Sequence, residues 1–146
     1  MRAVLAITAF LAVGTQPAGS AVPRDTTMAG TLHRVLAESF RVGAVRAVSR
    51  GALRVVVDEP LVKEPLYRAV LTRSCEAILE SREDPKRGMD ARALTTIEVV
   101  NRDERQGYVY RNLRGCAEVL EADQEGRRLA IVPGTTVFVP KRATKR

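Results

Sequence analysis

The sequence predicts a small α+β domain in which an antiparallel sheet, built from hairpins, carries one long and two shorter helices and one disulfide. Three observations indicate this class. Runs of β-branched residues come in pairs separated by turn residues, a long apolar stripe with helical spacing lies between two such pairs, and the chain of 146 residues has two cysteines. Hairpins with helices between them favour an antiparallel sheet whose helices lie on one face.

Residues 1–21 have the layout of a secretory signal peptide, with Arg2, then an apolar run from position 3 to 13, then helix-breaking and small residues. The run is 11 residues long, well short of the roughly 20 that a transmembrane helix needs. We therefore expect cleavage after Ala21, or one bond earlier after Ser20, and a secreted or periplasmic protein without a transmembrane segment. The alternative, a retained amphipathic helix, lacks polar residues at helical spacing.

The rest of the chain suits one domain. We expect a flexible leader at 22–30, a single α+β domain at 31–140 and a basic disordered tail at 141–146. Four of the net +7 charges lie in this tail, on Lys141, Arg142, Lys145 and Arg146. Between leader and tail, basic and acidic residues are nearly equal in number, so the high pI does not indicate a nucleic-acid surface. Arginine greatly outnumbers lysine, a bias that points to a GC-rich bacterial genome.

The first expected element is a helix of about three turns that begins at Thr31, a residue suited to the N-cap, and ends near Gly43. Its apolar stripe consists of Leu32, Val35, Leu36 and Phe40.

Two β-branched runs within residues 44–60 predict the first hairpin, because turn residues at 49–51 separate them. In its second strand, Leu53, Val55 and Val57 share the face expected to meet the core. Pro60 ends that strand.

The long helix is expected to begin at Pro65, because proline fits the first helical position, and to extend to about residue 83. Its apolar stripe consists of Tyr67, Val70, Leu71, Ser74, Cys75 and Ile78. A loop at 84–90 follows it.

The second hairpin pairs segment 93–101 with segment 107–112 across residues 102–106. Tyr108 and Tyr110 lie on one face of its second strand, and the loop length decides which face that is. An even number of loop residues places them in the core, beside Ile97 and Val99. An odd number turns them outward.

The C-terminal third is expected to contain a short helix at 113–122, a turn at 123–126 and a third hairpin. Segments 128–132 and 135–139 form this hairpin around Pro133 and Gly134, a pair suited to a type II turn.

Cys75 and Cys116 are expected to form a disulfide, because an exported chain with an even number of cysteines normally pairs them. Closing a loop of about 40 residues stabilises the fold by on the order of 4 kcal/mol. Redox catalysis would favour a close C-x-x-C pair, and a zinc site needs four ligands, whereas the two cysteines and His33 supply three. No metal or cofactor is expected.

Catalytic signals are scarce in the sequence. His33 is the only histidine, and no nucleophile-elbow, zinc-protease or phosphate-loop motif occurs. Carboxylates do cluster near 80–84 and 121–125, but arginines alternate with them, as on solvated surfaces. A pair of carboxylates in a small secreted hydrolase stays an alternative.

The second hairpin is the candidate binding surface. If the tyrosines face outward, they form an aromatic and guanidinium patch with the neighbouring polar side chains, and such patches suit a protein or an anionic partner. The candidate residues are Arg102, Arg105, Gln106, Tyr108, Tyr110 and Arg111. If the tyrosines face inward, the same arginines only cover core residues.

The sequence therefore favours an exported, non-catalytic domain that binds a protein or an envelope component. The alternatives are the carboxylate hydrolase and a basic protein that binds an anionic polymer or membrane surface through its tail. Specific nucleic-acid binding is not expected.

Overall fold

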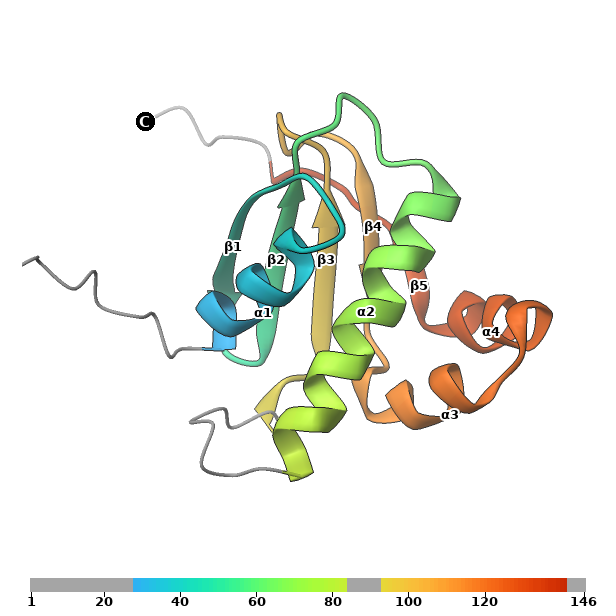
Figure 1. The fold of residues 1–146 in the computed structure, drawn as a ribbon. Helices are drawn as coiled ribbons and strands as arrows, with labels where there is room; N and C mark the ends of the chain where they lie inside the picture. Colours follow the sequence, from blue (N-terminus) through green and yellow to red (C-terminus); the bar gives the residue numbers. More distant parts are fainter. Residues whose placement is uncertain (1–27, 84–92, 142–146) are drawn as a thin grey trace, which may run out of the picture.

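The computed structural model describes residues 28–83 and 93–141, which form one five-stranded sheet with helices packed against it (Figure 1). In chain order the elements are α1 (Met28–Ala37), β1 (Val42–Ser49), β2 (Ala52–Val57), α2 (Glu64–Glu83), β3 (Thr96–Val100), β4 (Gly107–Tyr110), the 3-10 turn η3 (Leu113–Gly115), α3 (Cys116–Glu121), α4 (Gln124–Ile131), the 3-10 turn η4 (Val132–Gly134) and β5 (Thr135–Val137). The predicted signal peptide, most of the leader, the loop at 84–90 and tail residues Arg142, Lys145 and Arg146 lie outside the described residues.

The expected α+β class is confirmed, with one difference in the sheet. Its strand order is β1-β2-β3-β4-β5, and every neighbouring pair is antiparallel except β2 and β3. These two strands are parallel because α2 connects them, and a helical crossover returns the chain in the same direction. The sheet is thus mixed, with hairpins β1–β2 and β3–β4 on either side of the parallel pair.

One hydrophobic core lies between the sheet and the helices. The expected apolar stripe of α2 is confirmed, since all six of its residues are buried, and Leu53, Val55 and Val57 of β2 face the same core. Helices α1, α3 and α4 add buried side chains to it, among them Leu36 and Val119. All four helices therefore cover the same face of the sheet, as Figure 1 shows for α1 and α2.

Helix α1 differs in its bounds from the expectation. It begins at Met28 and ends at Ala37, so Thr31 lies inside the helix and is not its N-cap. The last residues of the expected leader, 28–30, belong to this helix. Phe40 and Gly43 follow the helix, and β1 begins at Val42, because the β-branched run of the first hairpin starts earlier than expected.

The second hairpin decides the orientation of the tyrosines. Val100 pairs with Gly107, so the loop between the strands has six residues, an even number. Tyr108 and Tyr110 consequently pair with Val99 and Ile97 on the helix-covered face. The outward-facing alternative is wrong.

The C-terminal third contains a helix where the sequence predicted a turn and a strand. Asp123 caps α4, because its carboxylate accepts a hydrogen bond from the Gly126 N–H at 2.7 Å. Residues 128–131 continue this helix, and Pro133 lies in a 3-10 turn. The prediction of a third hairpin is therefore wrong. The strand expected from residue 135 exists as β5, and it pairs with β4.

The expected disulfide between Cys75 and Cys116 is confirmed. Both residues are fully buried, and their Cα atoms lie 5.1 Å apart although 41 positions separate them. The bond joins the middle of α2 to the first residue of α3. It thereby fixes the start of the C-terminal segment that carries α4 and β5.

The second face of the sheet has a small core of its own. After β5 the chain turns across the top of the sheet toward β1 (Figure 1), and Phe138 packs on Val56, Val100 and Val109. The Arg54 guanidinium lies 5.0 Å from the centre of the Phe138 ring. None of the helices in residues 28–83 and 93–141 combines the length and apolar character needed to cross a bilayer.

Candidate functional site: a cleft between α2, α4 and β5

A cleft of about 290 Å³ opens where the N-terminal part of α2 meets α4 and the outer strands of the sheet. Residues from four elements and η4 line it: Glu64, Tyr67, Arg68, Tyr108, Arg128, Ile131, Val132 and Thr135. The cleft is mainly apolar inside and charged at its rim. This combination is typical of sites that bind a ligand by burying apolar groups and orienting them with a few polar contacts.

Two tyrosines form the aromatic floor of the cleft. The Tyr67 and Tyr108 rings are stacked with their centres 4.7 Å apart and their planes 30° apart. The Tyr67 hydroxyl forms a hydrogen bond with the Thr135 hydroxyl at 2.8 Å, and Thr135 donates to the Ile131 carbonyl oxygen. Burial raises the pKa of Tyr67 to about 12, so its hydroxyl stays neutral near pH 7. These contacts hold α2, β5 and the end of α4 around the cleft.

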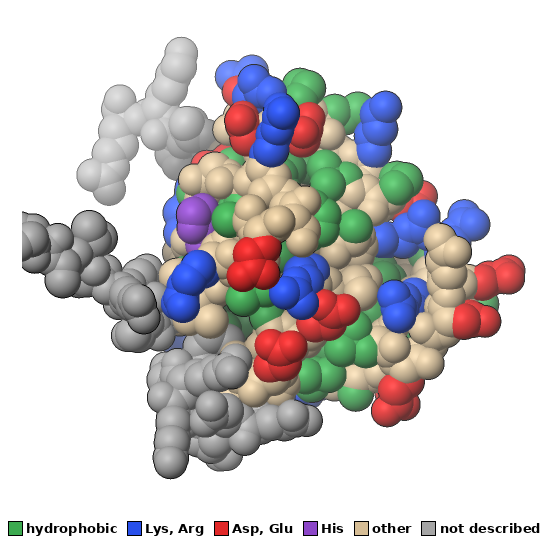
Figure 2. Space-filling view, viewed as in Figure 1, with side chains coloured by type: hydrophobic (Ala, Val, Ile, Leu, Met, Phe, Trp, Pro, Cys, Tyr) green, Lys and Arg blue, Asp and Glu red, His purple; other side chains and the backbone are tan. Residues whose placement is uncertain are grey.

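Three charged side chains form the rim. Glu64 lies 3.8 Å from Arg68, four residues later on α2, and 3.8 Å from Arg128 on α4. One carboxylate is thus shared by two guanidiniums, which leaves the rim with a net positive charge. All three side chains are partly or largely exposed, so the guanidiniums keep N–H groups available to a ligand. Figure 2 shows basic side chains gathered where α2 and α4 approach each other.

Exposed apolar side chains gather in the chain segment that supplies one wall of the cleft, and one of them, Val132, lines it. Leu129 and Val132 are 68% and 58% exposed beside α4, and Val137 and Val139 are 69% and 78% exposed along and after β5. These are four of the six large apolar residues that are exposed in the described chain, and they follow one another within 11 positions. Exposed apolar groups concentrated in one segment indicate a contact surface more strongly than the same groups scattered singly.

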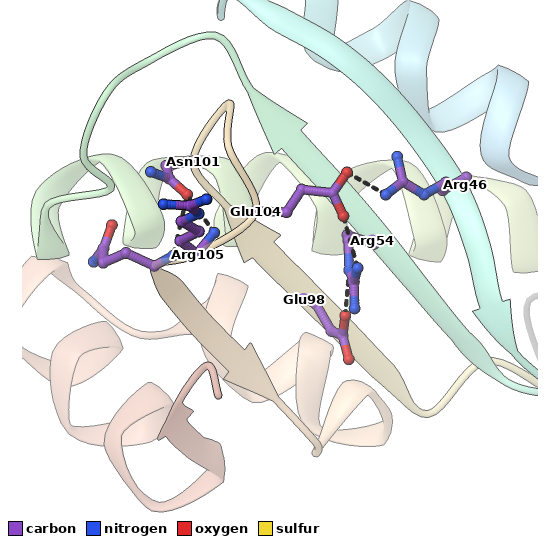
Figure 3. A network of polar contacts seen from close by, with 7 residues as sticks. Arg46, Arg54, Glu98, Asn101, Glu104 and Arg105 are labelled. Atoms are coloured by element: carbon purple, nitrogen blue, oxygen red, sulfur yellow. Dashed lines mark hydrogen bonds and ion pairs between the residues drawn. The ribbon is translucent and has the colours of Figure 1, made fainter. Parts of the chain in front are cut away.

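A second polar cluster lies on the opposite face of the sheet and has a structural role (Figure 3). Glu104, in the β3–β4 loop, accepts from Arg46 of β1 and from Arg54 of β2, and Arg54 also pairs with Glu98 at 2.6 Å. The hydrogen bond from Arg46, followed by that from Arg54, keeps the pKa of Glu104 below its usual value despite partial burial. Glu104 has a φ of 54°, a conformation that costs a non-glycine residue about 1 kcal/mol or more. The two ion pairs offset this cost and tie the loop to the first hairpin.

The predicted binding residues do not form one surface. Tyr108 lines the cleft, whereas Tyr110 is fully buried and its hydroxyl has no partner among the described atoms. Burial, together with the nearby Glu118 carboxylate, raises the pKa of Tyr110. Arg111 contacts Thr136, whose side chain belongs to the other face of β5.

The remaining three candidates lie in the β3–β4 loop, away from the cleft. The Gln106 side chain forms hydrogen bonds with both the N–H and the carbonyl oxygen of Val62, at 2.7 and 2.9 Å. Arg102 lies 3.6 Å from Asp58, and the Arg105 N–H donates to Asn101. The amide of Gln106 therefore anchors the loop to the segment before α2. Lys141, the one described residue of the basic tail, is exposed.

The sequence interpretation missed most of the cleft. The strand expected at 128–132 would place Arg128 and Ile131 away from α2. The signal for the helix was Asp123 at an N-cap position with Glu125 in the first turn. Tyr67 was recognised only as a core residue, because a helical stripe does not reveal that one end of it borders a cavity.

Metal-binding clusters are absent from the part of the chain that the structure describes. No group of three or more His, Cys, Asp or Glu side chains there is placed to hold a metal ion. Four cavities that the described residues line contain at most one carboxylate each. The Nε2 atom of His33 lies 3.4 Å from the Val42 carbonyl oxygen, where it joins α1 to β1.

Comparisons with protein-family models, curated proteins and solved structures found no match to this chain.

Proposed function

We propose that this protein is an exported, non-catalytic domain that binds a protein or an envelope component in the cleft between α2, α4 and β5. The observation that carries the proposal is the cleft, in which a stacked pair of tyrosines lies below a rim of two guanidiniums and one carboxylate. Tyrosine and arginine are the residues most often found at the energetic centres of protein interfaces, because both bury large surfaces and keep a polar end.

The arrangement of carboxylates favours binding over hydrolysis. A carboxylate hydrolase needs two acidic groups whose environments separate their pKa values. Glu64 is the one carboxylate that lines the cleft, and it is half exposed and shared by two arginines. Such a group suits an ion-pairing role at a rim.

Binding of an anionic polymer through the tail is the remaining alternative, and it makes a different prediction. It requires retention on heparin that falls with salt and disappears when residues 141–146 are deleted. Binding in the cleft is independent of that deletion, because Arg68 and Arg128 belong to α2 and α4.

The proposal is tested by capturing partners from the native envelope fraction on the immobilised, oxidised protein. Val132→Asp places a charge beside the cleft at a position that is 58% exposed, and Val48→Asp is the matched control on β1, at the opposite edge of the sheet. Both substitutions are at the surface, where they change stability by less than about 0.5 kcal/mol. We expect a partner that wild type and Val48→Asp retain and Val132→Asp loses. Equal retention by all three, or no partner at all, would refute binding in the cleft.

A further inference from the structure

The outer edge of β5 is open to another strand. β5 is the last strand in the sheet order, and within residues 28–83 and 93–141 its only strand neighbour is β4. The Arg111 N–H donates to the Gly134 carbonyl oxygen and the Phe138 N–H donates to the Gly107 carbonyl oxygen, both at 2.9 to 3.0 Å. Backbone groups alternate in direction along an antiparallel strand. The backbone N–H and C=O groups of the even-numbered residues in this segment therefore face β4, and those of Val137 face outward.

This open edge borders the cleft. Thr135, the first residue of β5, lines the cleft and bonds to Tyr67 on its floor. Val137 shares the helix-covered face with Thr135, because the two positions pair with Tyr108 and Tyr110 of β4. A strand added beside Val137 would therefore direct every second side chain toward the aromatic floor. Helices α2 and α4 bound the same space from the other side.

We propose that the ligand is an extended segment of a partner protein, which adds to β5 as a sixth strand and carries an acidic side chain for the rim. This inference rests on the proposed function and names the ligand. Strand addition beside a groove is a general mode of peptide recognition, in which backbone bonds supply affinity and alternate side chains supply specificity. Apolar side chains of the segment pack on Tyr108, which the buried Tyr67 ring supports from below, and its carboxylate pairs with Arg68 or Arg128.

Charge and length select a peptide over a second copy of this chain. The rim has two guanidiniums for one carboxylate, so two copies would bring like charges together at this edge. β5 has three residues, about 10 Å of strand. So short an edge pairs with a few residues of a peptide, and it is too short for the area of about 1,000 Å² that a stable dimer needs.

The experiment starts with a displayed library of random twelve-residue segments selected on the oxidised protein. Enriched segments are expected to alternate apolar residues and to contain Asp or Glu. The best segment is synthesised with both ends capped, so that no terminal carboxylate contributes. Replacing its acidic residue by the amide is expected to weaken binding about fivefold, the equivalent of one exposed ion pair.

Backbone methylation of the peptide tests strand addition without altering the protein. In an added strand only alternate N–H groups point to β5. Single N-methylations are therefore expected to weaken binding about tenfold or more at every second position and little at the positions between. On the protein, Val137→Pro removes the outward N–H and is expected to weaken binding to a similar extent. Val137→Thr keeps that N–H and is the matched control.

Each other outcome overturns a stated part of the inference. If the methylation effects do not alternate along the peptide, but the Val132→Asp variant still fails to bind it, strand addition is rejected. Binding in the cleft then remains supported. If the selected peptides bind the Val132→Asp variant as well as wild type, a peptide ligand for the cleft is rejected. The same follows if the selection on wild type enriches no segment that a selection on that variant does not. Sedimentation that reveals a dimer abolished by Val137→Pro assigns the edge to a second copy.

Discussion

Removal of the disulfide is the perturbation whose effect follows most directly from the structure. Cys75 and Cys116 are fully buried, and the bond closes a loop across 41 positions. The chain-entropy model assigns such a loop about 4 kcal/mol of stabilisation, because the cross-link restricts the unfolded chain. That is a large share of the roughly 5 to 15 kcal/mol that a domain of this size has in total.

The variant to measure replaces both cysteines by alanine. For a domain of this size each kcal/mol lowers the Tm by about 4 °C, so we expect the Tm to fall by about 15 °C in scanning calorimetry. The denaturant dependence of unfolding should also become steeper, because the unfolded chain without the cross-link exposes more surface. The variant's Tm should not respond to reductant, whereas that of wild type should fall to nearly the same value.

A Tm within about 5 °C of wild type would contradict the chain-entropy reasoning. Free thiols on both cysteines in natural material, detected by mass spectrometry, would contradict the cross-link itself. The bond also bears on the cleft, since it anchors α3 to α2 and α4 follows directly. We therefore expect the double-alanine variant to be cleaved faster by proteases around α3 and α4 than around β1 and β2.

Three further substitutions test separate parts of the fold. Gly107→Ala should lower the free energy of unfolding by about 3 kcal/mol or more, because a Cβ there would lie 2.0 Å from a backbone oxygen of β3. In the control Gly43→Ala, the nearest contact of the added Cβ is an ordinary 3.7 Å. Equal melting temperatures of the two variants would disprove the close approach. Tyr110→Phe should leave the free energy of unfolding unchanged or raise it by up to about 1 kcal/mol, because the buried Tyr110 hydroxyl has no partner among the described atoms. A clearly lower free energy of unfolding in denaturant would show that the hydroxyl is bonded. Glu104→Gln should lower the free energy of unfolding by about 1 kcal/mol at pH 7. The folded-state pKa of Glu104 is depressed below its ordinary 4.5. The difference from wild type should therefore vanish as the pH falls through that lowered pKa. A difference that persists at pH 2 would refute the ion-pair explanation.

Local patterns in the sequence were sufficient for much of the fold. The stripe on α2 was predicted residue by residue, because the spacing of apolar positions on a helix depends only on the helical period. The two hairpins were predicted from β-branched runs around turn residues. The pairing of Cys75 with Cys116 needed only the count of cysteines and the expectation of export.

Three features depended on information that a local pattern does not contain. The short apolar run at 129–132 suits a strand as well as a helix, and the Asp123 cap with packing of Ile131 on the core made the segment helical. The face of Tyr108 depended on whether the β3–β4 loop has an even or odd length. Bonds between Gln106 and Val62, far apart in the sequence, hold that loop in its six-residue form.

The sequence by itself therefore determined the class of the fold, its longest helix, its two hairpins and its cross-link, because each depends on residues within one element or on a residue count. Only the tertiary structure decided where the cleft lies. Its walls come from α2, α4, β4 and β5, and their side chains meet only after the helical crossover and the disulfide have brought distant segments together. A cavity is a property of the space between elements, and no periodicity along a single element encodes it.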